Sequence, residues 1–311
     1  FSPPVENPDG FLAALDKSRQ SYEQEGWLKS ETTFSEPLQR TDGYWERIVV
    51  YSATYVIDGF LDRESEYVAP FQNASGEWVT VLSRELIHGG FLGNIGEGYI
   101  AYITDFGPYV VTGDGQIVPP RTRDTTQLDN VTVGYINYGE PLQGTDGNWY
   151  SNPVGTAVSY DFSSGHVSET DYSDTVLAHP DTGAISNAPT EYRLFINDVM
   201  VSNVVYHDPV FDELNRIWQW PEFRRTNYSL SGVILSEQTF SDVLFADAGY
   251  PEVVAELQKN WTNGVLATTS SYFSPYKEGG TWFSRIWRTT YHLDGCYIEF
   301  DEEGQQVANT C

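Results

Sequence analysis

The sequence predicts a mainly β protein: an antiparallel β-barrel or packed sheets, built from a repeated strand unit and carrying a few peripheral helices. Three observations predict this class: strand-like alternation, an internal repeat with a Gly-x-Trp motif, and no regular alternation of strands with long helices. The chain has 311 residues, of which 40% are hydrophobic and 15% aromatic, so it can bury a core. We expect residues 1–135 to hold an N-terminal helix and a first β repeat. Residues 136–311 would hold a second repeat and the C-terminal strands, packed with the first part as one compact unit.

Three helices are expected. Residues 9–28 carry apolar side chains at roughly helical spacing, with Asp9 placed to cap the start and Gly26 near the end. Shorter helices are expected at residues 212–218 and 251–261.

The other expected elements are strands. Residues 48–57 are dense in β-branched and aromatic side chains and end in the turn signal Asp58-Gly59. Residues 154–162 alternate apolar with small or polar side chains, and this period of two is typical of a half-buried antiparallel strand. The segment Phe195–Met200 predicts a tight hairpin. Further strands are expected at residues 99–104, 109–112, 201–206, 233–236 and 297–300.

An internal repeat is the most informative feature. The segment Glu36–Trp45 recurs as Glu140–Trp149 with eight of ten positions identical, and Gly279–Trp282 is a shorter third copy. Each copy precedes a strand-like run and a turn, so Trp45 and its two counterparts should occupy equivalent buried positions. Such units avoid open edges by closing into a barrel or packing as two sheets. The Gly-x-Trp motif at a strand entrance resembles that of the lipocalins and related calycin barrels.

The net charge of −27 indicates which partners are excluded. Such a charge repels phosphate backbones, and no Lys/Arg cluster offsets it, so we expect no nucleic-acid partner. Anionic membrane surfaces are disfavoured for the same reason. No apolar run approaches the roughly 18 residues that span a bilayer. We expect a monomer whose partner is a small aromatic substrate or ligand.

Three features favour secretion. The chain starts at Phe1 rather than Met, which suggests either a removed leader or a scar of recombinant expression, and of the two we expect a cleaved signal peptide. A disulfide between its only cysteines, Cys296 and Cys311, would close a loop of about 15 residues and contribute about 3 kcal/mol. A cytosolic protein with two free thiols is the alternative. Four sequons suggest an extracellular glycoprotein, and their acceptors are Asn73, Asn130, Asn227 and Asn260.

The whole chain resembles the secreted luciferases of syllid fireworms. The likeness lies in Phe1–Gly10, Leu12–Arg19 and Ser21–Leu28, and in the acidic, aromatic-rich character of the chain. The resemblance implies the oxygen-dependent oxidation of a small heteroaromatic luciferin with emission of light. No cofactor beyond O₂ is required in that chemistry, and a metal site is left open. No functional residue is carried over from the family.

Residue types suggest the roles that this chemistry needs. A base must remove a proton from the substrate, and a cation would stabilise the developing negative charge. The base candidates are His88, His207 and His292, the cation candidate is Arg224, and the ligand-binding candidates are Trp218, Trp220, Tyr206 and Phe91. We expect a closed, mostly apolar cavity that holds the flat substrate and excludes water.

Structural readings of the same residues stay open. The aromatic side chains can be core and strand packing, Asp212 can cap a solvated turn beside His207, and Arg224 and Arg225 can partner nearby acids. Two other functions also stay open. A lipocalin-like binding protein would use the pocket without catalysis. A carbohydrate-active enzyme would show an open groove with two facing carboxylates and an exposed tryptophan.

Overall fold

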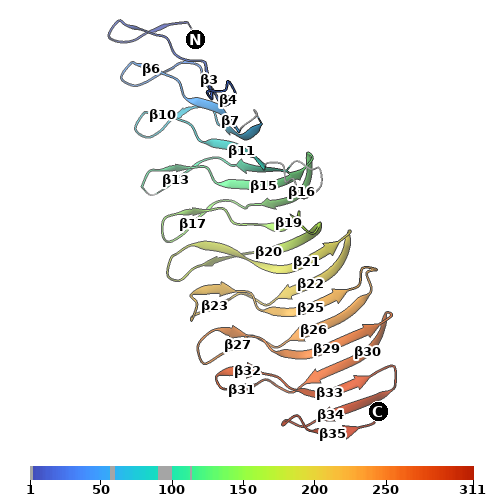
Figure 1. Ribbon diagram of the computed structural model, residues 1–311. Coiled ribbons are helices and arrows are strands. Elements are labelled where there is room, and N and C mark those ends of the chain that lie inside the picture. Colours follow the sequence, from blue (N-terminus) through green and yellow to red (C-terminus); the bar gives the residue numbers. More distant parts are fainter. Residues whose placement is uncertain (1–2, 57–59, 90–99, 113) are drawn as a thin grey trace. The chain divides into compact units, whose positions relative to one another are not determined.

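The computed structural model describes residues 3–56, 60–89, 100–112 and 114–311. In this part of the chain every regular element is a β-strand (Figure 1), and no helix is long and apolar enough to cross a bilayer. The chain divides into two compact units, Phe1–Asn152 and Pro153–Cys311. The boundary expected after residue 135 would cut the strand β16 (Val131–Asn137), which pairs with its neighbour inside the first unit.

The first unit is an antiparallel sheet in which each long strand pairs with the long strands before and after it in the sequence. The strands before β16 are β3 (Ser18–Tyr22), β4 (Leu28–Phe34), β7 (Val49–Tyr55), β8 (Leu61–Tyr67), β11 (Leu82–Gly89), β12 (Ile100–Phe106) and β15 (Arg121–Leu128). Short hairpins are inserted at every second connection. They are β1 (Val5–Glu6) with β2 (Leu12–Ala13), β5 (Leu38–Gln39) with β6 (Trp45–Glu46), β9 (Phe71–Gln72) with β10 (Trp78–Val79), β13 (Val110–Val111) with β14 (Ile117–Val118), and β17 (Leu142–Gln143) with β18 (Trp149–Tyr150).

The second unit follows the same plan, except that β20 and β21 are long and pair out to Ala178 and Ile185 with no separate short hairpin between them. Its long strands are β19 (Gly155–Asp161), β20 (His166–Ala178), β21 (Ile185–Ile196), β22 (Val199–Tyr206), β25 (Glu222–Tyr228), β26 (Ile234–Phe240), β29 (Ala255–Thr262), β30 (Val265–Tyr272), β33 (Ile286–Tyr291), β34 (Cys296–Phe300) and β35 (Gln306–Asn309). The short hairpins are β23 (Val210–Asp212) with β24 (Ile217–Gln219), β27 (Leu244–Phe245) with β28 (Pro251–Glu252), and β31 (Tyr276–Glu278) with β32 (Thr281–Phe283).

The repeat is shorter than the two long sequence copies suggest. Successive short hairpins begin at Val5, Leu38 and Phe71, that is, every 33 residues. A period of this size is typical of repeat proteins in which each unit buries its surface against the next. The copies at Glu36–Trp45 and Glu140–Trp149 belong to the second and fifth short hairpins of the first unit, and diverged copies lie between them.

The repeated Thr-Asp-Gly sequence is explained by the turn of the short hairpin. In the β5–β6 turn, Gly43 has a φ of 87° and donates its N–H to the Arg40 carbonyl at 3.0 Å. The Asp42 carboxylate accepts the N–H of Tyr44 at 3.1 Å. Glycine adopts a positive φ without strain, and Asp accepts from the backbone two residues later, so both residues favour this turn.

Tryptophans connect consecutive short hairpins. The indole N–H of Trp45 donates to the Glu6 carbonyl at 3.2 Å, and that of Trp78 donates to the Gln39 carbonyl at 2.9 Å. In the second unit Trp282 donates in the same way to Phe245 at 2.8 Å. The expected equivalence of Trp45, Trp149 and Trp282 agrees with their places on the second strand of a short hairpin, although all three are half-buried.

The indole hydrogen bond predicts a difference in stability between two matched variants. Trp78→Phe removes the donor to Gln39 and should lower the free energy of unfolding by about 1 kcal/mol more than Trp149→Phe. Both substitutions shrink the ring equally, but the Trp149 indole has no hydrogen-bond partner among the described residues. Urea unfolding followed by circular dichroism measures the difference. Equal losses would show that the indole hydrogen bond contributes nothing.

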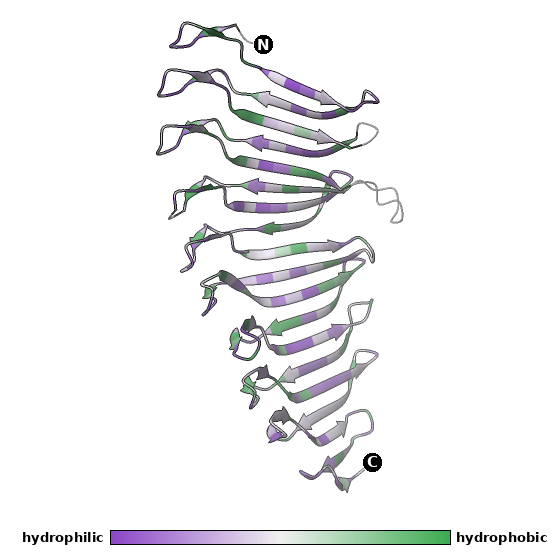
Figure 2. Ribbon diagram, turned by 60° about the vertical axis from the view of Figure 1, so that its left-hand side comes forward, coloured by the Kyte–Doolittle hydropathy of each residue, from purple (hydrophilic) through white to green (hydrophobic). Residues whose placement is uncertain are grey.

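The expected barrel is not present. Within each unit no described pairing joins the last long strand to the first, so each sheet is open. The reason lies in the faces of the sheet, since a barrel or sandwich needs one apolar face. In the second unit Ser168, Ser202 and Ser236 lie in register on one face, while the adjacent register on the other face holds Glu169 and Glu237. Figure 2 shows hydrophilic residues along the strands of both units.

The three expected helices are also wrong. Residues 9–28 form a turn, β2, β3 and the start of β4. Phe11 is 72% exposed and Leu12 is 68% exposed, so these apolar residues do not form a buried helical face. Gly10 and Gly26 have φ values of 80° and 88° and belong to hairpin turns rather than to helix ends. Residues 212–218 form the β23–β24 turn and much of β24, and residues 251–261 form β28 and most of β29.

The cysteines form the expected disulfide. Cys296 is buried at the start of β34, and its sulfur is bonded to that of Cys311 with the two Cα atoms 5.0 Å apart. The bridge ties the last residue of the sequence to the penultimate strand of the second sheet.

Candidate functional site

Strand register brings a histidine, a glutamate and a tyrosine together on one face of the first sheet. Glu64 on β8 lies opposite Leu86 on β11 and opposite Ala53 on β7. His88 is two residues beyond Leu86, and Tyr51 is two residues before Ala53. Since every second residue of a strand points to the same face, both side chains project beside Glu64.

The three side chains form a hydrogen-bonded chain. His88 Nε2 lies 3.3 Å from Glu64 Oε2, and the Tyr51 hydroxyl donates to Glu64 Oε1 at 2.8 Å. The side chain of His88 is 12% exposed and that of Glu64 is 28% exposed. A neutral imidazole that donates its Nε2–H to a carboxylate carries its basic lone pair on Nδ1. This is the arrangement of a base and the group that orients it.

The phenol keeps the carboxylate in place. Burial raises the pKa of Tyr51 well above its ordinary value, and the hydrogen bond to Glu64 raises it further. Tyr51 therefore stays protonated and continues to donate. The pKa of the neighbouring Tyr55 is raised by burial and then by the charges of Glu31 and Glu64. Sequence reasoning missed Glu64 and Tyr51, because their meeting with His88 depends on strand register.

The other catalytic candidates lie in the second unit, each with different neighbours. His207 Nε2 is 2.8 Å from the Ser241 carbonyl oxygen, which can only accept, so this nitrogen carries a proton. His292 is exposed, and its Nε2 is 2.8 Å from Thr269 Oγ1. Arg224 is exposed on β25, opposite Val205 and Thr239. Of the three base candidates, His88 is the one that lies within ion-pair distance of a carboxylate among the described residues.

Two of the ligand-binding candidates line one hollow. Trp218 and Trp220, from β24 and the residue after it, border a space of about 250 Å³ together with His179, Ile185 and Ile217. This volume is below the roughly 300 Å³ at which small-molecule sites begin. Tyr206 is not in the lining but lies on β22 opposite Glu222, and Phe91 lies outside the described residues.

His179, the histidine in this hollow, has a structural role. Its Nε2 lies 2.7 Å from the Arg216 carbonyl oxygen and therefore carries a proton. Its Nδ1 accepts the backbone N–H groups of Asp181 at 3.2 Å and Thr182 at 3.3 Å. With both nitrogens engaged in these hydrogen bonds, the ring has no lone pair available as a base.

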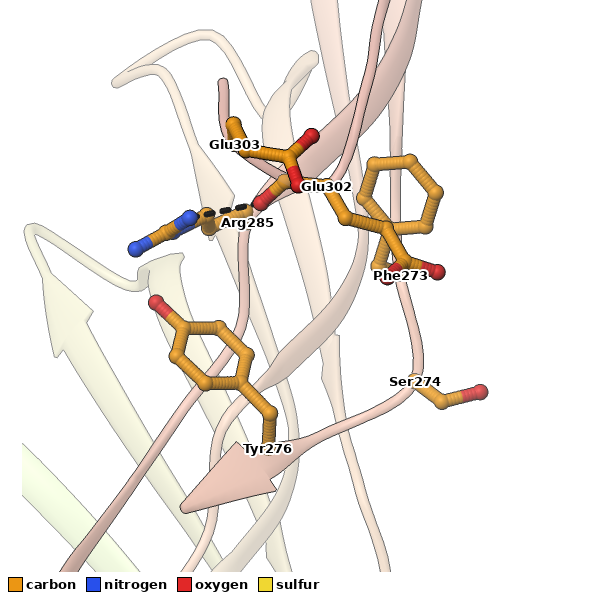
Figure 3. Close-up of a pocket in the computed structure, with 6 residues that line it drawn as sticks. All are labelled: Phe273, Ser274, Tyr276, Arg285, Glu302 and Glu303. Atoms are coloured by element: carbon orange, nitrogen blue, oxygen red, sulfur yellow. Dashed lines mark hydrogen bonds between the residues drawn. The ribbon is translucent and has the colours of Figure 1, made fainter. Parts of the chain in front are cut away.

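A second hollow in the same unit, of about 410 Å³, lies between the start of β33 and the β34–β35 turn. Figure 3 shows Arg285 beside Tyr276 and donating to the Glu302 carbonyl. The guanidinium carbon lies 4.8 Å from the centre of the Tyr276 ring, a cation–π distance. Through these contacts Arg285 stabilises the β34–β35 turn. Both hollows are open to solvent, so neither is the enclosed apolar cavity expected from the sequence.

The densest ionic cluster of the second unit surrounds Arg193. Its guanidinium is 2.9 Å from Glu169, 2.9 Å from Asp171 and 3.3 Å from Glu191. Burial is the largest influence on the pKa of Asp171 and opposes ionisation. The Thr156 hydroxyl and Arg193 outweigh burial and lower the pKa of Asp171 below its usual value near 3.8.

The lowered pKa of Asp171 predicts acid sensitivity. A carboxyl group whose pKa is lower in the folded state stabilises fully above its unfolded pKa, and this contribution is lost as the pH falls through the folded pKa. Wild type should therefore lose stability between about pH 5 and pH 2 more steeply than Asp171→Asn. Urea midpoints measured across this range test the prediction. Parallel curves for the two proteins would contradict it.

The four sequons differ in accessibility. Asn130 is exposed in the two-residue turn between β15 and β16 and has a φ of 64°. Asn73 is held in the β9–β10 turn, where its side-chain oxygen accepts two backbone N–H groups. Asn227 and Asn260 lie on strands and donate their amide N–H to hydroxyls of Ser236 and Thr268. Asn130 is thus the best-presented acceptor for a glycan.

Among the described residues no group of three or more His, Cys, Asp and Glu side chains is arranged to hold a metal ion. No protein-family model matches the sequence, and no curated protein matches it. Two solved structures show weak likeness. A porin-like protein from Bacteroides uniformis is 10% identical, with a TM-score of 0.16, over 88% of this chain and 93% of that chain. TcdB2-TccC3 is 11% identical, with a TM-score of 0.15, over 99% of this chain and 23% of that chain. These scores are too low to identify a common fold.

Proposed function

We propose that this protein is an oxygen-dependent luciferase that oxidises a small heteroaromatic luciferin, with His88 as the base. The resemblance to the fireworm luciferases suggests the reaction. The pairing of His88 with Glu64 is the observation that supports the choice of base. Among the described ion pairs it is the one that contains a histidine.

The proposed chemistry assigns a role to each of the three hydrogen-bonded residues, His88, Glu64 and Tyr51. Nδ1 of His88 is buried, and it would take a proton from the luciferin carbon that reacts with O₂ once luciferin displaces the side chains that cover it. Glu64 would hold the imidazole in the tautomer with the lone pair on Nδ1 and offset its positive charge after proton transfer. Tyr51 would hold Glu64. Luciferin is the compound oxidised and O₂ the compound reduced, and Arg224 stays a prediction for the cation that stabilises the negative charge.

Oxygen uptake separates this proposal from a binding protein without catalysis. The purified protein is placed in an oxygen electrode, fireworm luciferin is added, and uptake is compared with that of luciferin alone. We expect uptake to rise with protein concentration until the luciferin is consumed. Luciferin that binds, as seen by equilibrium dialysis, without accelerated uptake would overturn the proposal and favour the binding protein.

A further inference from the structure

The indole N–H of Trp149 departs from the tryptophan pattern of the repeat, as do those of Trp218 and Trp220 in the second unit. The indole N–H of Trp45 and that of Trp78 each donate to a carbonyl of the preceding hairpin. The N–H of Trp149 finds no partner among the described residues. At this point a hollow of about 570 Å³ lies between the β13–β14 and β17–β18 hairpins. Its volume is within the roughly 300–1,000 Å³ typical of small-molecule sites.

Each hairpin contributes a carboxylate beside an amide. Gln116 Nε2 donates to Asp114 Oδ2 at 2.9 Å, and Asn148 Nδ2 donates to Asp146 Oδ2 at 2.8 Å. A side-chain amide nitrogen carries two hydrogens, so each has one beyond the bond to its carboxylate. A carboxylate can accept about four hydrogen bonds. The described donors to Asp114 and to Asp146 do not fill these positions, so each carboxylate can still accept a hydrogen bond from a ligand. The hollow thus presents two acceptor–donor pairs, one from each repeat.

The charge of the hollow narrows the ligand class. Hydrogen bonds from Thr112 and Tyr150 lower the pKa values of Asp114 and Asp146, respectively, so both are ionised at neutral pH. Two carboxylates disfavour an anionic ligand. A cation would be attracted by both carboxylates, so cations are the competing ligand class that the experiment must separate. A neutral ligand with many hydroxyls suits the pairs, because a hydroxyl both donates and accepts.

The aromatic residues complete the match. Trp149 and Tyr150 line the hollow beside the polar pairs, and the Tyr150 hydroxyl donates to Asp146 at 2.6 Å. An aromatic ring offers an apolar face for the C–H side of a sugar ring while the polar groups engage its hydroxyls. We propose that this hollow binds a neutral saccharide, with Asp114–Gln116 and Asp146–Asn148 bonded to vicinal hydroxyls. This site is independent of the proposed oxidation at His88.

Ligand-observed saturation-transfer NMR on the intact chain tests the site with glucose, galactose, mannose and cellobiose at millimolar concentration. We expect at least one sugar to show transfer to its ring protons. Asp146→Asn changes the β17–β18 hairpin and Gln116→Ala changes the β13–β14 hairpin. Each variant should bind the sugar at least tenfold more weakly than wild type. Asp42→Asn is the matched control, because it changes the same Thr-Asp-Gly turn in the β5–β6 hairpin. Circular dichroism verifies that the variants are folded.

Three results would overturn the proposal. The first is the absence of transfer to any of the four sugars. The second is that wild type, Asp146→Asn and Gln116→Ala bind the sugar equally well, or that the control Asp42→Asn loses as much binding as the two site variants. The third is displacement of the sugar signal by tetramethylammonium at lower concentration than by a second sugar, which would identify a cation site.

Discussion

His88→Gln should emit at least 100-fold less light than wild type with fireworm luciferin in air. A positioned general base contributes about 10²–10⁴-fold to a rate. Glutamine retains an N–H group that can donate to Glu64, but it cannot accept a proton from carbon. Glu64→Gln should lower kcat with little change in KM, because Glu64 acts through His88 rather than on the substrate. Integrated photon counts at saturating luciferin measure both effects.

The matched control is His292→Gln. His292 is exposed and its described partner is a threonine hydroxyl, so this variant should keep wild-type light output. If His88→Gln emitted like wild type while His292→Gln or a His207 variant went dark, the base would be another histidine. Unfolding midpoints of all variants should agree, so that a loss of light is not a loss of fold.

Removing the disulfide should destabilise the C-terminal end of the second sheet by about 3 kcal/mol, the value expected for a closed loop of about 15 residues. The double variant Cys296→Ser, Cys311→Ser and the wild type in dithiothreitol should behave alike. The loss is local because repeat units contact only their neighbours. Hydrogen exchange should therefore accelerate in β34 and β35 and stay unchanged in β19 and β20.

Exchange in β34 and β35 that is equally protected with and without reductant would contradict this prediction. In that case the backbone pairing of β34 with β33 and β35, together with the hydrogen bond from the Tyr297 N–H to Thr310 Oγ1 at 2.9 Å, would hold the end of the sheet alone.

Strand patterns were predictable because they are local. The strand expected at residues 48–57 appears as β7 (Val49–Tyr55), while Ile57 and the expected Asp58-Gly59 turn lie outside the described residues. The strand expected at 154–162 appears as β19, and the hairpin at Asn197-Asp198 has the positive φ values of a two-residue turn. The helix expected over residues 9–28 failed for a physical reason. Strands interrupted by tight turns also place apolar residues three or four apart, and Gly10 and Gly26 serve such turns as readily as helix ends.

Whether the sheet closes into a barrel, and whether His88 meets Glu64, both depend on contacts between residues far apart in the sequence. Whether a sheet closes depends on the composition of both faces, and register decides which residues share a face. Glu64 and His88 lie 24 residues apart, and one residue of slippage would place them on opposite faces. The sequence marked His88 by residue type but could not identify Glu64. The repeat in the sequence pointed to Trp149, but it could not show that the indole N–H of this residue lacks a partner among the described residues.

Light emission from the purified chain tests the central claim most directly. The protein is mixed with fireworm luciferin in air-saturated buffer without ATP, flavin or added metal, and photons are counted against a nitrogen-purged sample. The account predicts light that rises with protein concentration, disappears under nitrogen and returns when air is admitted. No light above the luciferin blank from folded protein in air would contradict it.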